Sequence, residues 1–257
     1  MQGDEVLYEV RSGTARLTLN REASRNSLDA GTIGLMDAAL DSALADDTVR
    51  AVCITGIGDR VFCSGADLGS ALAGGDPSEG PRRYALLLRR ILDFPKPVVA
   101  RVNGHCMGGG LGLMLACDLA FAREGIRIGT PEVKVGLFPM MVAPLLLRAV
   151  PRQRAMEMML TGEPVDAVEA QRIGLVSRVV PSAEFDTTVD SVLAAICANA
   201  PVAIRMGRQA IREVEGGKPG TLLELMSGKL LDLLQTEDAA EGLTAFLEKR
   251  PPKWKGR

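Results

Sequence analysis

The chain has 257 residues, 47% of them hydrophobic and 24% charged, so it can bury a full core as one large domain or as a domain with an appendage. Its net charge of −2 and its scattered lysines and arginines give no electrostatic footprint for nucleic acid or for an anionic membrane. Only 4% of the residues are aromatic, which argues against a surface that stacks nucleic-acid bases.

The cysteines and the apolar runs bear on the compartment. The five cysteines are an odd number without C-x-x-C spacing, and the N-terminus lacks a basic-then-apolar signal pattern. No run of about eighteen apolar residues indicates a membrane span. We therefore expect reduced thiols, a cytoplasmic location and no membrane partner.

The first half of the chain predicts short strands separated by helices. A strand pair is expected around Ser12-Gly13, and Asp29 is a plausible N-cap for a helix that runs to about Leu44. Residues 69–81 are rich in Gly, Pro, Ser and Asp, which predicts a mobile surface loop. The expected strands lie at 6–10, 15–19, 51–55, just before Phe62-Cys63, and at 98–102, 118–122 and 127–129, and a helix covers 82–92.

The repeated order of strand pair and helix favours an α/β fold of ββα units over a βαβ dinucleotide-binding unit. Residues 111–116 are almost wholly apolar, so a helix there has to be buried. From about Ala183 the sequence becomes mostly helical, and residues 222–234 include more apolar side chains than one amphipathic helix needs inside a monomer. We expect a ββα core in residues 1–182 and a helical oligomerisation region in residues 183–257. Its helices are expected at 185–198, 201–214, 221–234 and 237–249.

The sequence lacks the residues needed for several common kinds of catalysis. His105 is the one histidine, and no G-x-S-x-G elbow accompanies it, so we interpret His105 as structural. One histidine and unpaired cysteines leave too few ligands for a zinc site, and we predict no metal. Neither G-x-G-x-x-G nor a P-loop motif occurs, so the sequence lacks the glycine-rich loops that bind the phosphates of nicotinamide cofactors and of nucleoside triphosphates.

Three glycines, Gly108, Gly109 and Gly110, precede the apolar stretch. Glycines at the start of a helix expose backbone N–H groups and allow a ligand to approach closely. Taken alone, the triplet is equally consistent with a tight turn needed for packing.

The surrounding motifs decide between these readings. Residues 93–111 (DFPKPVVARVNGHCMGGGL) and 61–68 (VFCSGADL) closely resemble signatures of the enoyl-CoA hydratase/isomerase (crotonase) family. The segments 130–137 (TPEVKVGL) and 161–176 follow in the family's order. The resemblance covers nearly the whole chain.

The resemblance implies a crotonase-like spiral of ββα units with a C-terminal helical trimerisation region, assembled as a trimer or a dimer of trimers. The substrate it implies is an acyl-CoA thioester, so coenzyme A is part of the substrate and no cofactor is expected. Motif matching gives Ala66 N–H and Gly109 N–H as the two donors to a thioester enolate, each worth about 3–4 kcal/mol. Asp67 is a further candidate contact to the substrate, and we expect it to shape its loop and not to perform chemistry.

Glu132 is the candidate acid/base, and it matches one of two family glutamates. It follows Thr130-Pro131, where proline stiffens the approach. Apolar walls should raise the pKa of the carboxyl toward the working pH. The candidate walls are Leu137, Phe138, Met140 and Met141.

Gly112 is the main departure from the family pattern, because hydratases of the family carry their second glutamate there. A hydratase uses two carboxylates to position and activate water, whereas one carboxylate suffices to move a proton between two carbons. Gly112 is also expected to leave empty volume beside the reacting carbons.

Other family positions suggest contacts to the substrate. Phe138 and Met140 suggest a remodelled acyl pocket, although Met140 is equally consistent with core filler. Three residues match family positions that reach coenzyme A: Arg25, Phe246 and Lys249. In the family, the last two positions sometimes reach it across a subunit boundary. Each of the three is equally consistent with an ordinary surface or core role. Backbone contacts to coenzyme A are expected from Ser64 and Leu68.

Three hypotheses follow. The first is a Δ3-Δ2 enoyl-CoA isomerase that uses Glu132 alone. The second is an enoyl-CoA hydratase with an atypical site, and the third is a non-catalytic acyl-CoA-binding homologue.

Overall fold

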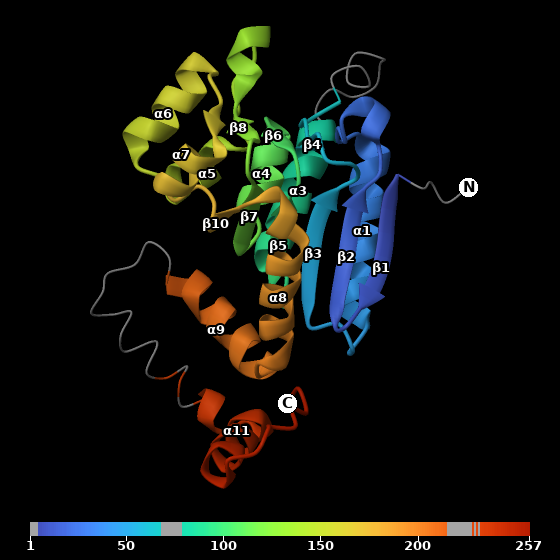
Figure 1. Ribbon diagram of the computed structural model, residues 1–257, viewed down its shortest axis with the longest axis vertical. Coiled ribbons are helices and arrows are strands. Elements are labelled where there is room, and N and C mark those ends of the chain that lie inside the picture. The colour runs from blue at the N-terminus through green and yellow to red at the C-terminus, as the bar shows by residue number, and fades with distance from the viewer. Residues whose placement is uncertain (1–4, 68–78, 215–227, 229, 231) are drawn as a thin grey trace.

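The computed structural model describes residues 5–67, 79–214, 228, 230 and 232–257, and Figure 1 shows their arrangement. Two sheets and the helices around them form the body of the molecule, while the last helices extend away from it (Figure 1). Three predictions fall wholly or largely outside the described residues: the loop over 69–78, the contact of Leu68 with coenzyme A, and most of the helix at 221–234.

The larger sheet has the strand order β1-β2-β3-β5-β7-β10. The first pair is antiparallel, with Val6 opposite Leu19, and every later pair is parallel. Its strands are β1 (Val6–Arg11), β2 (Thr14–Leu19), β3 (Ala51–Gly56), β5 (Val98–Val102), β7 (Leu119–Arg123) and β10 (Arg178–Val180).

The smaller sheet has the order β4-β6-β8-β9. Successive strand pairs, β3 with β4, β5 with β6, and β7 with β8, each give one strand to each sheet, which confirms the predicted spiral of ββα units. Its strands are β4 (Val61–Cys63), β6 (His105–Met107), β8 (Arg127–Gly129) and β9 (Val165–Asp166).

Helices cover both faces of the larger sheet, which explains why all six residues of β3 are buried. Val52 and Ile54 point into the main core, to which α1 (Ala30–Ala45) and α3 (Glu79–Asp93) contribute. Ala51 and Cys53 point to the other face, where α8 (Phe185–Ala198) packs. The other helical segments are η1 (Glu22–Ser24), α4 (Gly109–Leu115), η2 (Pro131–Val135), α5 (Ala143–Ala149), α6 (Arg152–Thr161), α7 (Ala167–Arg172), η3 (Ser182–Glu184), α9 (Pro201–Val214) and α11 (Glu237–Glu248).

The ends of two helices test the prediction. Asp29 does cap α1, because its carboxylate accepts a hydrogen bond of 2.8 Å from Thr32 N–H. Helix α3 begins at Glu79, so the prediction of a loop as far as Pro81 is wrong over its last residues. Proline is tolerated in the first turn of a helix, where its missing N–H would have had no partner.

The C-terminal helices lie at the opposite end of the molecule from the small sheet (Figure 1). Helix α11 packs mainly on α9, and it exposes Leu243, Phe246 and Leu247. The predicted division at residue 182 and the assembly into trimers stay predictions. Within the described residues, no single helix is long and apolar enough to cross a membrane. The bent helix pair Ser182–Ala198 and Pro201–Glu213, taken together, has the length and composition of a membrane span.

Candidate active site

Three neighbouring parallel strands of the small sheet deliver the predicted site residues. β4 leads into Ser64–Asp67, β6 leads into Gly108, and β8 leads into Thr130 and η2. The carboxyl ends of parallel strands lie at the same edge of a sheet, which is where α/β proteins commonly bind ligands. Segments that are far apart in the sequence therefore meet at one place.

The two predicted donors, Ala66 and Gly109, come from backbones that touch. A Cβ built on Gly65 would lie 2.7 Å from Gly109 N, and a Cβ built on Gly109 would lie 3.4 Å from Ala66 N. Gly65 also has a φ of +97°, which side chains rarely adopt. Within the described part of the chain, neither Ala66 N–H nor Gly109 N–H donates a hydrogen bond.

The loop that carries Ala66 is fixed by backbone pairing with Leu28. Leu28 N–H donates to Gly65 O over 2.8 Å, and Asp67 N–H donates to Leu28 O over 2.9 Å. Ser64 N–H donates to the carbonyl of Arg25 over 3.2 Å. These bonds hold the Ala66 peptide in place from both sides.

Asp67 has a structural role in the same loop. Its carboxylate accepts hydrogen bonds of 3.2 Å from the Arg21 guanidinium and from the Ser27 hydroxyl. The Arg21 side chain also pairs with Asp29 at 2.8 Å, so the loop is tied to the start of α1. The Asp67 carboxylate is therefore engaged in holding the loop.

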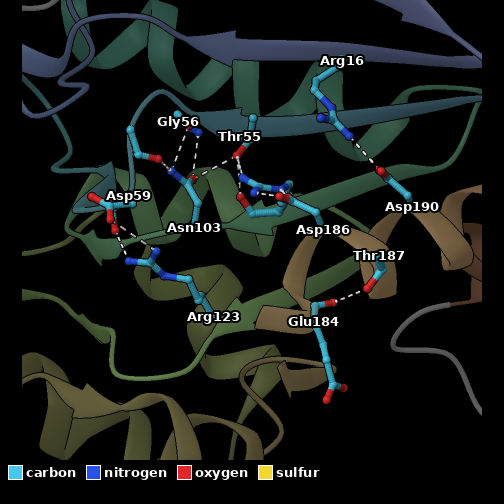
Figure 2. A network of polar contacts seen from close by, with 12 residues as sticks. Arg16, Thr55, Gly56, Asp59, Asn103, Arg123, Glu184, Asp186, Thr187 and Asp190 are labelled. Carbon is cyan, nitrogen blue, oxygen red and sulfur yellow. Dashed lines mark hydrogen bonds and ion pairs between the residues drawn. The ribbon is translucent and has the colours of Figure 1, made fainter. Parts of the chain in front are cut away.

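The turn between β5 and β6, which precedes the three glycines, is fixed by Asn103, shown in Figure 2. Its buried amide donates to the carbonyls of Gly56 and Gly58 at 2.9 and 2.7 Å and accepts from Gly56 N–H at 3.1 Å. A Cβ on Gly104 would lie 2.3 Å from Val61 N, so glycine permits the close passage to β4. This turn carries the chain from the large sheet to the small one and aims it at Gly108.

Glu132 lies against the same glycine segment. A Cβ built on Gly108 would lie 3.1 Å from Glu132 Oε1, which places the carboxyl beside the first residue of the triplet. The preceding Thr130 is buried and donates to Met158 O over 3.1 Å, which fixes the start of η2. Glu132 Oε2 is buried and has no hydrogen-bond partner in the described structure.

The environment of Glu132 favours its protonated form. Burial raises the pKa of the carboxyl above its usual value, and a hydrogen bond from its own backbone N–H opposes this only in part. The predicted apolar walls contribute less than expected, because Leu137 and Met140 are 51% and 68% exposed in the single chain. Phe138 and Met141 are half-buried and pack against the core.

The expectation of empty volume at Gly112 is wrong, because Tyr84 fills it. A Cβ built on Gly112 would lie 2.4 Å from Tyr84 Oη and 3.3 Å from Val142 Cγ2. The Tyr84 hydroxyl donates a hydrogen bond to Gly109 O. Tyr84 is thus a site residue that sequence reasoning missed, and no motif around it connects α3 to the glycine helix.

Cys63 lies behind the site. A Cβ on Gly110 would lie 2.3 Å from Cys63 O, so the first turn of α4 packs directly on β4. Burial raises the pKa of the Cys63 thiol to about 12, which keeps it a neutral packing group. Among the described residues, no group of three or more side chains could hold a metal ion.

The remaining predicted contacts to coenzyme A lie in two places, because the Arg25 backbone pairs with Ser64 whereas Phe246 and Lys249 belong to the end of α11. Arg25 is exposed, in a left-handed conformation with φ of 55°, and lines a surface hollow of about 500 Å³ together with Arg60 and Val61. Phe246 is 81% exposed, and Lys249 ends α11 at the opposite end of the molecule (Figure 1). Their contacts with coenzyme A stay predictions.

The ββα spiral, with the Ala66, Gly109 and Glu132 segments together at one sheet edge, is what the resemblance to acyl-CoA enzymes of the crotonase type predicted. The family model described as enoyl-CoA hydratase/isomerase matches residues 9–257, so the chain belongs to that family.

The relatives cover almost the entire chain. It is 34% identical to the short-chain-enoyl-CoA hydratase of Clostridium acetobutylicum, with 97% of each protein covered. It is 36% identical to the 2,3-dehydroadipyl-CoA hydratase of Escherichia coli, covering 98% of this chain and 99% of that protein. The solved enoyl-CoA hydratase of Bacillus anthracis matches with a TM-score of 0.94 and 29% identity, covering 99% of this chain and all of the other.

Proposed function

We propose that the chain is a Δ3-Δ2 enoyl-CoA isomerase in which Glu132 alone carries the proton. The observation that carries this proposal is the Glu132 carboxyl beside Gly108, whose Oε2 is buried without a hydrogen-bond partner in the described structure, combined with a tyrosine over Gly112. One carboxylate can serve both ends of a proton transfer, whereas none of the described residues beside Gly112 offers a second base.

The proposed reaction has two proton steps. The Glu132 carboxylate removes a proton from C2 of a 3-enoyl-CoA, and the electrons of that C–H bond delocalise to give a dienolate with its charge on the thioester oxygen. Ala66 N–H and Gly109 N–H donate to that oxygen, which lowers the barrier by about 3–4 kcal/mol for each donor. The protonated Glu132 then gives the proton to C4, which leaves a double bond between C2 and C3 and restores the carboxylate.

The raised pKa of Glu132 fits this role. A carboxylate whose protonated form is favoured is a stronger base toward a carbon acid, and it retains the proton until C4 takes it. Half-burial of the carboxyl also limits exchange of the carried proton with bulk water.

Hydration is the second candidate, because relatives at 34–36% identity carry the name hydratase. In that reaction Glu132 would act together with a water molecule or a substrate group, since a second carboxylate is missing at Gly112. A third outcome, binding without turnover, would make the chain an acyl-CoA-binding homologue.

Assays on paired substrates separate these candidates. The purified full chain is offered straight-chain 3-enoyl-CoA and 2-enoyl-CoA esters of several lengths, and formation or loss of the conjugated enoyl thioester is followed by ultraviolet absorbance. We expect 3-enoyl-CoA to be converted faster than 2-enoyl-CoA is hydrated. Faster hydration, with 3-enoyl-CoA unchanged, would overturn the isomerase proposal, and binding without either reaction would overturn both catalytic candidates.

We also propose a homo-oligomer, a trimer or a dimer of trimers, assembled through the C-terminal helices in a cytoplasmic setting. The supporting observation is the apolar surface of α11, where Leu243, Phe246 and Leu247 are 59%, 81% and 79% exposed. Apolar side chains gathered in this way are typical of an interface between subunits. Light scattering on the full chain should give the mass of a trimer or hexamer, and a monomer would contradict the proposal.

A further inference from the structure

We infer that Tyr84 determines which reaction this site performs, because its ring keeps water away from the reacting carbons. This inference rests on the isomerase function proposed above. Its basis is the position of one side chain from α3 over the first turn of α4.

The position follows from helix geometry. Gly109 and Gly112 are three residues apart, so they lie on the same face of α4. A thioester whose oxygen is held by Gly109 N–H would therefore run its acyl carbons past Gly112. Tyr84 lies over this same face, since its Cζ would be 3.5 Å from a Cβ on Gly109 and its Oη 2.4 Å from a Cβ on Gly112.

The tyrosine is also held there. Its hydroxyl donates to Gly109 O, and its ring packs against the main core. Val142 also takes up part of this space, with Cγ2 3.3 Å from the position of a Gly112 Cβ. A water molecule above C3 of the enoyl chain would have to share this volume with the ring.

Tyr84 cannot itself serve as a base that activates water. Burial raises the pKa of its phenol well above the usual value, and the neighbouring charge of Glu132 raises it further. The phenol thus stays neutral near pH 7, and its one proton is donated to the backbone. The group fills space and excludes water without taking part in proton transfer, which leaves Glu132 to carry the proton alone.

The test measures how each variant divides its activity between hydration and isomerisation. Tyr84→Ala opens the volume, and Tyr84→Ala combined with Gly112→Glu adds a second carboxylate to it. Tyr84→Phe keeps the ring. The chain has two tyrosines, so Tyr8→Ala on β1 is the matched control.

We expect Tyr84→Ala to raise the ratio of hydration of 2-enoyl-CoA to isomerisation of 3-enoyl-CoA by about tenfold or more, and the double variant to raise it further. Tyr84→Phe and Tyr8→Ala should leave the ratio within about threefold. Isomerisation in deuterium oxide gives a second readout, because Tyr84→Ala should increase deuterium at C4 of the product as water reaches protonated Glu132.

An unchanged ratio and unchanged deuterium content in a folded Tyr84→Ala variant would overturn the inference. So would a large loss of both activities in Tyr84→Phe, which would assign the function to the hydroxyl instead of the ring. If the wild-type chain mainly hydrates 2-enoyl-CoA, the isomerase proposal is overturned. In that case, a lower hydration rate in Tyr84→Ala than in the wild type would overturn the inference about Tyr84 as well.

Discussion

The edge of the small sheet and the C-terminal helices both carry predicted contacts to the substrate, yet only at the sheet edge does the structure bring several of the predicted residues together. At the sheet edge, the Gly65-Ala66 backbone lies against Gly109, and the Glu132 carboxyl lies beside Gly108. At the other end, Phe246 stands out from α11 with 81% of its surface exposed (Figure 1). The groups proposed to hold the enolate thus lie together within one chain, whereas Phe246, which is proposed to reach coenzyme A, lies on a helix at the other end of the molecule.

Loss of the carboxylate should have the largest effect at the sheet edge. We expect Glu132→Gln to lower kcat by about 10²–10⁴-fold, because the amide cannot accept and return a proton. Glu163→Gln is the matched control, since Glu163 is an exposed glutamate paired with Lys134. Activity of Glu132→Gln near the wild-type level, measured on the better enoyl-CoA ester, would remove Glu132 from the mechanism.

Separation of the two N–H donors should have the next largest effect. Gly65→Ala places a Cβ 2.7 Å from Gly109 N at a φ of +97°, so the loops have to move apart. We expect kcat to fall by about 10²–10³-fold, as when one oxyanion donor is lost. Gly125→Ala is the control, because Gly125 has a φ of +77° and no atom within 4 Å of the built Cβ.

At the other end the expected effect is smaller and of another kind. Phe246→Ala should raise KM for the acyl-CoA by about three- to tenfold and leave kcat nearly unchanged, because it removes binding shared by ground state and transition state. Steady-state kinetics checks this, together with the oligomer mass. A kcat that falls in parallel with kcat/KM would assign Phe246 to the chemical step and erase the contrast between the two regions.

The smallest expected effect is a shift in the pH dependence of kcat/KM, caused by the raised pKa of Glu132. The reacting form of Glu132 is its carboxylate, and burial raises the pKa of that group. Accordingly, kcat/KM should fall as the pH drops through a midpoint above 4.5, the ordinary value for glutamate. A pH–rate profile of the wild type measures the midpoint, and a midpoint at or below the ordinary value would contradict the burial of the carboxyl.

Local patterns in the sequence predicted much of this arrangement. The strand pairs, the Asp29 cap and the buried glycine helix follow from side-chain periodicity and from residues whose preferences act within a few positions. The motifs around Ala66, Gly109 and Glu132 lie at the ends of strands, so their meeting at one sheet edge follows once the strands are parallel.

By itself, then, the sequence determined the family, the ββα order and the segments proposed to hold the enolate, because local preferences and motif spacing encode them. Tertiary structure decided what surrounds those segments. Tyr84 comes from α3 and fills the place over Gly112, while Leu137 and Met140 remain exposed. Such outcomes depend on how side chains from distant elements share one volume, which no pattern along the chain records.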